Sequence, residues 1–197
     1  LIFGLLLWHL YIFALGQSGV LSTYELPPRF PILLIVPAFI FTGIFAYRNK
    51  DKTWLQNIPA SWLLFYQSFR IIIESLFVFT VAAGFLHKNV TIEGYNYDMI
   101  FGYTAPIVGL LFVRNYSFSH TLAKAWNYLG LAVIAVIIFL FISTTYFPSF
   151  YGSDILLMPI EFTNYPYVIV AGFLMPSAVF IHVLSLVQLN GLNKKAF

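Results

Sequence analysis

Long apolar runs divide this chain, and they constrain its fold more than any other feature. A membrane-spanning helix needs about 20 mostly apolar residues. Six segments approach or exceed that length: about 1–20, 31–47, 60–86, 97–113, 122–146 and 166–188. The runs are continuously apolar and do not alternate, so they are typical of helices and not of barrel strands. We therefore expect an all-α, polytopic membrane helical bundle, with about six transmembrane helices arranged as three hairpins.

Composition supports a membrane protein over a soluble one. Hydrophobic residues make up 60% of the 197 residues and charged residues only 9%, whereas soluble domains carry about 25% charged residues. A soluble fold of this size could not bury so much apolar surface. Nothing indicates a linker or a second domain, so we expect a single integral membrane domain over residues 1–197.

The first apolar run has two interpretations. Residues 1–15 followed by Gly16 could resemble a signal peptide. However, no basic segment precedes the run, and it continues to about Leu21. We favour a genuine first transmembrane helix.

The distribution of Lys and Arg predicts the orientation, because short cytoplasmic loops are rich in these residues. Seven basic residues fall on one predicted side: Arg48, Lys50, Lys52, Arg114, Lys124, Lys194 and Lys195. Only Arg29 and Lys88 fall on the other, and Arg70 lies within a span. We therefore expect a multi-pass protein of the cell inner (cytoplasmic) membrane with both termini cytoplasmic. Trp126 is expected in the aromatic belt at the cytoplasmic interface.

Charge and missing motifs exclude several functions. The net charge is +3, but the basic residues lie between apolar runs and form no patch for nucleic acid. The chain has no cysteine, which removes disulfides and thiolate metal sites. It also lacks the Gly-rich, P-loop and catalytic motifs of common enzymes. We expect no metal and no cofactor, haem included; the expected partners are the lipid bilayer and a membrane protein or a second copy of the chain.

Three prolines recur at nearly equal spacing. Pro37, Pro106 and Pro176 lie in the second helix of each predicted hairpin, 69 and 70 residues apart. Asn57 and Asn127 are also 70 residues apart. Parallel repeats are a known plan of membrane transporters, but proline is common in membrane helices. A threefold hairpin repeat and three independent kinks are therefore both open.

The third apolar segment carries a polar stripe. Gln67, Arg70 and Glu74 stand at positions i, i+3 and i+7 and so share one helix face. Ionisable groups in the membrane are costly and need a partner or a function. Arg70 and Glu74 are four residues apart and can pair directly. The stripe is either a neutralised pair that fixes helix packing or the polar lining of a solute or ion path.

Other polar residues have similar expected depths. Arg70 lies roughly 15 Å from the cytoplasmic end of its helix, and His9 and His182 lie roughly 9–13 Å from that side. Gln67 and Asn127 fall in the same half of the membrane. We predict an inner polar core composed of Gln67, Arg70, Glu74, Asn127, His182 and His9, in which Arg70, Asn127 and His182 face one common space. Two histidines at similar depth also allow bis-histidine haem binding, but hydrogen bonds between helices are the commoner role.

The loop before the fourth segment carries a second polar group. Asn96 or Asp98 can cap the free N–H groups of that helix, and capping alone is sufficient to explain Asp98. Alternatively, Glu93, Asn96 and Asp98 form an acidic outer vestibule, joined by Asp154 and Glu161, that attracts cations.

Four stretches resemble an uncharacterised family of bacterial multi-pass membrane proteins. They are Phe69-Arg70 through Glu74, Thr91 to Asp98, Ala125 to Gly130 and His182 to Gln188. The resemblance covers roughly residues 59–188 and implies no activity. It implies that a set of polar residues belongs together: Arg70, Glu74, Glu93, Asn96, Asp98, Asn127 and His182.

These features favour a membrane protein with a polar core that binds or transports a small solute or ion. The alternative is a non-catalytic partner subunit or assembly factor of a larger membrane complex; a membrane-embedded enzyme or haem protein ranks third. A transport protein should contain a continuous polar cavity that reaches one face. A partner subunit should hold Arg70 and Glu74 in dry packing and expose a small-residue or aromatic face.

Topology is the first testable prediction. Reporter fusions after Lys52, Arg114 and Lys195 should be cytoplasmic, because these positions flank the basic ends of the helices. Fusions in residues 21–30, 87–95 and 148–164 should be external. An external C-terminus would contradict six spans.

Overall fold

The computed structural model describes residues 2–195, and within that range the chain is helical and has no β-strand. Its main helices are α1 (Ile2–Ser18), α2 (Val36–Asn49), α3 (Thr53–Asn57), α4 (Ala60–Tyr66), α5 (Phe69–Ala82), α6 (Asp98–Val113), α7 (Ser119–Tyr146) and α8 (Met175–Lys195). Two π-helices, η1 (Pro31–Ile35) and η5 (Val170–Leu174), lead into α2 and α8, and three short 3₁₀ turns are η2 (Lys88–Val90), η3 (Pro148–Tyr151) and η4 (Ile160–Thr163). The expectation of an all-α fold is confirmed.

Four helical segments are long and apolar enough to cross a membrane: Pro31–Asn49, Ala60–Ala82, Ser119–Tyr146 and Val170–Leu192. The other two expected spans are shorter apolar helices, with 17 residues in α1 and 16 in α6. At 1.5 Å per residue these helices are about 26 and 24 Å long, against about 30 Å of hydrocarbon. The chain is thus a membrane-compatible helical bundle with four full-length candidate spans.

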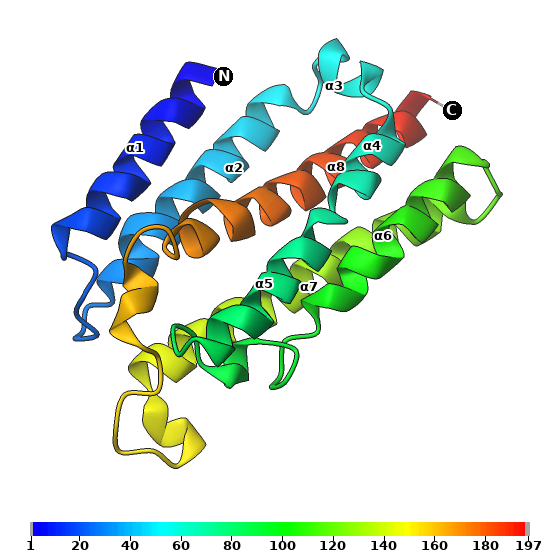
Figure 1. Ribbon diagram of the computed structural model, residues 1–197. Helices are drawn as coiled ribbons and strands as arrows, with labels where there is room; N and C mark the ends of the chain where they lie inside the picture. The colour runs from blue at the N-terminus through cyan, green and yellow to red at the C-terminus, as the bar shows by residue number, and fades with distance from the viewer. Residues whose placement is uncertain (1, 196–197) are drawn as a thin grey trace.

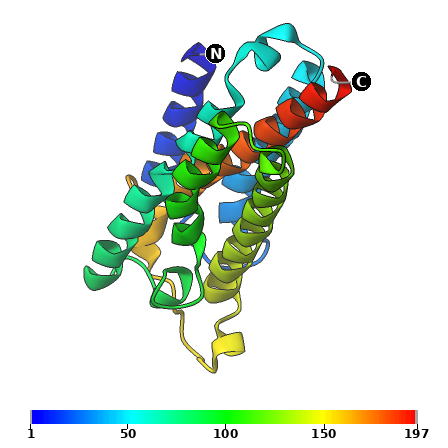
Figure 2. The same ribbon diagram turned by 90° about the vertical axis from the view of Figure 1, so that its right-hand side faces the viewer.

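The helices alternate between two ends of the bundle (Figures 1 and 2). One end holds both termini, α3 and the α6–α7 connection; the other holds the loops 19–30, 83–97 and 147–168. Helix α8 runs through the middle and packs against α2, α4 and α7, while α6 packs between α4, α5 and α7. The basic residues of the α2–α4 and α6–α7 connections therefore lie at the end that holds the termini.

The third expected span is not one continuous helix. It breaks at Gln67 and Ser68 into α4 and α5. Around the break, each backbone N–H donates to the carbonyl three residues earlier, from Gln67 to Leu64 at 3.2 Å and from Ile71 to Ser68 at 3.1 Å. Such 3₁₀ stretches inside helices often mark hinges or functional sites. The span expected over 60–86 is present as Ala60–Ala82, but the break within it was not predicted, because apolar character does not distinguish i+3 from i+4 hydrogen bonding.

Each π-helix ends shortly before a proline, and a proline has no backbone N–H to donate. Val36 donates five residues back to Pro31, and Met175 donates five residues back to Val170. Pro37 and Pro176 follow directly and have no N–H. The carbonyls four residues before them, Leu33 and Gly172, consequently lose their usual helical donors.

Helix α1 supplies replacement donors for these two carbonyls. Tyr11 donates from its hydroxyl to the Leu33 carbonyl at 3.0 Å, and Trp8 donates from Nε1 to the Gly172 carbonyl at 2.8 Å. Ile12 packs directly onto Gly172. Since lipid offers no hydrogen bonds to a free carbonyl, one face of α1 stabilises both proline-interrupted helices.

The three regularly spaced prolines lie in two different kinds of local structure. Pro37 and Pro176 each follow a π-helix, and η1 contacts η5. Pro106 lies inside α6, which is α-helical from Asp98 to Val113. Helices α2 and α8 therefore share a local structure that α6 does not.

Removing the α1 donors should destabilise the protein. Trp8→Phe keeps an aromatic ring but leaves the Gly172 carbonyl without a donor. The free energy of unfolding, measured by denaturant titration in detergent, should therefore fall by about 1–3 kcal/mol. In a Pro176→Ala background, the new backbone N–H can replace the indole, so the loss should shrink. Trp54→Phe is the control, because that indole bonds the exposed side chain of Asn49. Equal losses in both backgrounds would contradict this role of Trp8.

Candidate functional site

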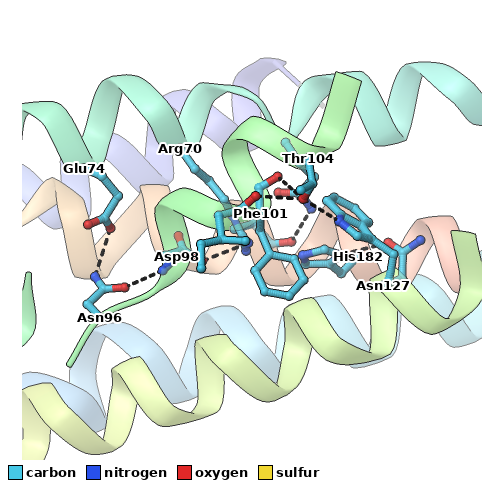
Figure 3. Close-up of polar contacts among 12 residues, drawn as sticks. Arg70, Glu74, Asn96, Asp98, Phe101, Thr104, Asn127 and His182 are labelled. Atoms are coloured by element: carbon cyan, nitrogen blue, oxygen red, sulfur yellow. Dashed lines mark hydrogen bonds and ion pairs between the residues drawn. The ribbon is translucent and has the colours of Figure 1, made fainter. Parts of the chain in front are cut away.

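The buried polar residues form two networks that follow one another along α6 (Figure 3). Arg70, Glu74, Asn96 and Asp98 lie at the start of this helix. Asn127 and His182 lie further along it, beyond Phe101 and Thr104. The grouping therefore differs from the one expected from the sequence. Asn96 and Asp98, expected in the outer vestibule, lie with Arg70 and Glu74 of the expected inner core.

An ion pair links α5 to the first residue of α6. Arg70 Nη1 lies 2.9 Å from Asp98 Oδ1, and the Arg70 side chain is only 2% exposed. The two helices can approach closely because residue 102 is a glycine. A Cβ at this position would come within 2.8 Å of the Ile71 side chain. Arg70 was expected to contact Glu74 or another acidic or carbonyl partner, and its acidic partner is Asp98 on the neighbouring helix, not Glu74 one turn away.

Asn96 connects Glu74 to the start of α6. Its Nδ2 donates to Glu74 Oε1 and to the Val90 carbonyl, both at 3.0 Å. Its Oδ1 accepts from the backbone N–H of Asp98 at 2.8 Å. Asn96 is therefore the residue that caps α6, and the interpretation of Asp98 as a simple cap was wrong, because the Asp98 carboxylate faces Arg70.

Several polar atoms of this cluster lack hydrogen-bond partners within the described residues. They are Glu74 Oε2 and the Nε and Nη2 atoms of Arg70, all inaccessible to solvent. Glu74 itself is only 3% exposed. An unpaired buried polar atom is costly, so this cluster is the part of the described chain best suited to receive a ligand.

A narrow cavity of about 60 Å³ adjoins the cluster. Arg70, Glu74 and Asp98 are its only charged lining residues, and η1 and η5 contribute to its wall. The remaining lining is almost entirely apolar: Phe30, Pro31, Ile35, Phe69, Ile73, Phe77, Ile134, Ile137, Ile138, Phe141, Ile142, Thr145, Tyr146, Val170, Ala171, Leu174, Met175 and Ala178. The cavity is thus an apolar slot with a charged cluster in its wall, and not a continuous polar path.

The second network joins α7 to α8. His182 donates from Nδ1 to Asn127 Oδ1 at 2.8 Å, and Asn127 Nδ2 donates to Ser185 Oγ at 3.0 Å. The His182 ring also packs on Gly130 and on Trp126, with a 5.3 Å centroid distance to the indole. Neither Asn127 nor His182 lines the cavity beside Arg70. Asn127 and His182 are both buried, but they do not share the cavity that Arg70 lines.

The remaining predicted residues lie in separate places. Gln67 is buried and donates to the Ala178 carbonyl at 3.1 Å. His9 bonds the Leu5 carbonyl at 2.9 Å, and its ring lies tilted against Phe173, outside the charged cluster. Glu93 is exposed, as are Asp154 and Glu161, so these three residues do not form a buried vestibule with Asp98.

Trp126 is the clearest residue whose role the sequence pattern missed. It was expected at the membrane interface, yet it is 7% exposed and donates to Thr104 Oγ1 of α6 at 3.0 Å. Its position four residues after Leu122 and one before Asn127 offered a signal, since the indole and the amide can contact the same two helices.

Comparison with protein-family models, curated proteins and solved structures finds no match to this chain. The functional argument therefore rests on the geometry of the site.

The ion pair predicts a coupled mutational effect. Arg70→Ala and Asp98→Ala should each lower the free energy of unfolding by about 3–5 kcal/mol, because each leaves a buried charge unpaired. The double variant should lose much less than the sum of the two. Unfolding titrations in detergent measure all three; simple additivity would show that the residues are not coupled.

The second network predicts a different effect. In Gly130→Ala the new Cβ would collide with the His182 ring, so the His182–Asn127 hydrogen bond should break. Unfolding stability should fall by about 1–3 kcal/mol, as for overpacking of a core. Gly43→Ala is the control, because a Cβ there meets nothing within 4 Å. Equal stability of the two variants would contradict the packing of His182 on Gly130.

Proposed function

We propose that this chain is an integral membrane protein that binds a small positively charged solute or ion at the cluster of Arg70, Glu74 and Asp98. One observation carries the proposal: Glu74 Oε2 is buried, has no partner in the described chain, and belongs to a residue that lines the cavity. The paired Arg70 and Asp98 neutralise one another, so the charge of Glu74, when this residue is ionised, has no counter-charge in the cluster.

The uncompensated charge of ionised Glu74 determines the sign of the ligand's charge. An isolated carboxylate at membrane depth costs several kcal/mol. A proton or a bound cation removes this cost, and an anion increases it. The hydrogen bond from Asn96 to Glu74 Oε1 orients the carboxylate and leaves Oε2 for the ligand.

We further propose six spans in three hairpins, in a bacterial inner membrane, with both termini cytoplasmic. The alternation of the helices between two ends supports this topology (Figure 1), as does the concentration of basic residues at the end that holds the termini. The short α6 is compatible with a span because part of the loop before it is buried in the protein: Val90, Thr91 and Asn96 are at most 1% exposed. Irregular backbone at membrane depth is tolerated where it is buried in protein.

A partner subunit is the second candidate function. Its support is a groove of about 680 Å³ between α1, α2 and α8, lined by residues that include Leu5, Phe41 and Phe180. The first turns of α1 are exposed, with Ile2 and Phe3 above 70%. A helix of another protein could bind this apolar face.

Glu74→Gln tests the proposed function. We would titrate NaCl, KCl and NH4Cl into purified protein and follow the thermal unfolding midpoint and proton release. For the wild type, at least one cation should raise the midpoint while Glu74 releases a proton. Glu74→Gln should fold, since it retains an acceptor for Asn96, but should lose at least about tenfold in apparent affinity, or 1.4 kcal/mol.

Glu25→Gln is the matched control, because Glu25 is an exposed acid in the loop between α1 and η1. It should respond as the wild type does. A Glu74→Gln protein with wild-type cation response and proton release would contradict the proposed function.

A further inference from the structure

The cavity places its charge and its apolar surface in different parts. Glu74, Arg70 and Asp98 form the charged part. The α7 wall runs from Ile134 to Tyr146, thirteen residues, which span about 18 Å of helix. It leads towards the end of the bundle that holds the loops 19–30 and 147–168 (Figure 1). A ligand that fills this slot needs a polar head and an apolar body.

We infer that the site takes an organic ammonium ion with a short, linear apolar body, its head at Glu74 Oε2 and its body along α7. This inference rests on the proposed function, because it names the class of cation that the cluster binds.

The charged groups disfavour an anionic or zwitterionic head. Arg70 has unpartnered N–H groups, so a ligand carboxylate could bond them. It would also face Asp98, 2.9 Å from the guanidinium, and the excess carboxylate of Glu74. A cation makes the cluster neutral, a zwitterion leaves its excess negative charge in place, and an anion doubles it.

The slot also disfavours a bare inorganic cation. Metal cations such as Ca²⁺ and Mg²⁺ need about six or more oxygen ligands, and no group of three or more His, Asp or Glu side chains lies together within residues 2–195. An ammonium head needs only a few acceptors and is attracted to aromatic faces. Phe69 and Phe77 belong to the cavity lining next to the charged residues on α5.

The apolar wall of the cavity favours a ligand whose body is apolar. Ile73, Ile138 and Phe141 offer no hydrogen bonds to a polar chain, whereas each buried methylene gains about 0.8 kcal/mol. The cavity volume of about 60 Å³ fits an ammonium head with its first carbons and is well below the roughly 300–1,000 Å³ of drug-sized pockets. The cavity is partly open, so a longer body can extend along its apolar lining. The π-helices η1 and η5, a feature frequent at functional sites, contribute to that lining.

A chain-length series tests the inference on full-length protein in a non-ionic detergent. The probes are methyl-, propyl- and hexylammonium chloride, and binding is measured by titration calorimetry at constant ionic strength. Affinity should rise about fourfold per methylene, the conversion of 0.8 kcal/mol. Hexanoate, hexanol and the zwitterion norleucine should each bind at least tenfold more weakly than hexylammonium.

Variants separate binding at this site from partition into detergent. Glu74→Gln should lose binding of every ammonium probe, and Glu25→Gln should keep it. Ile138→Phe narrows the slot beyond the head, so it should weaken hexylammonium at least tenfold and leave methylammonium nearly unchanged. Because Ile138→Phe retains all three charged residues, methylammonium binding also reports that the variant is folded.

The outcomes distinguish this inference from the proposed function. If inorganic cations or protons bind in a Glu74-dependent way but alkylammonium ions show no gain with chain length, the inference is overturned and the proposed function stands. If hexanoate or norleucine binds more tightly than hexylammonium, the ligand class is wrong. If no cation or proton response depends on Glu74, both are overturned.

Discussion

Polar groups in a bilayer have no water to replace a missing partner, and this constraint organises the whole bundle. It acts on the backbone at Pro37 and Pro176, where Tyr11 and Trp8 of α1 bond the Leu33 and Gly172 carbonyls. It acts on side chains at the start of α6, where Arg70 pairs with Asp98 and Asn96 caps the helix. Beside these partnered groups, Glu74 Oε2 is a buried carboxylate oxygen in the cavity wall that has no partner within the described residues.

Much of the fold could be predicted from the sequence, because apolar run length is a direct physical requirement of a spanning helix. The inward position of Gln67, Arg70 and Glu74 also followed from helical periodicity, and all three are at most 3% exposed. Local departures could not be predicted in this way. The break at Gln67 and Ser68 and the π-helices at η1 and η5 keep the same apolar residues and change only which carbonyl each N–H bonds.

The composition of the candidate site depended on helix neighbours, which no single sequence displays. Arg70 pairs with Asp98, 28 residues later, because Gly102 lets α6 approach α5. Depth estimates placed Asn127 and His182 near Arg70, yet these two bond each other and Ser185 on the α7–α8 side. Similar depth is therefore insufficient to define one site: direction around each helix decides it. Gln188 is a second example of a contact that depends on helix neighbours. Its side-chain amide donates to the Leu55 carbonyl at 2.7 Å, and the pattern of polar residues did not predict this hydrogen bond.

Infrared difference spectroscopy of the carboxyl groups is the most direct measurement of the central claim, that Glu74 carries the charge which a cation neutralises. At a pH where the free protein holds a proton on this cluster, we expect a protonated-carboxyl band that weakens as an ammonium ion is added. The band should be absent from Glu74→Gln and retained in Glu25→Gln. A carboxyl band that persists in Glu74→Gln, or that does not respond to the cation, would contradict the assignment of Glu74 as the binding group.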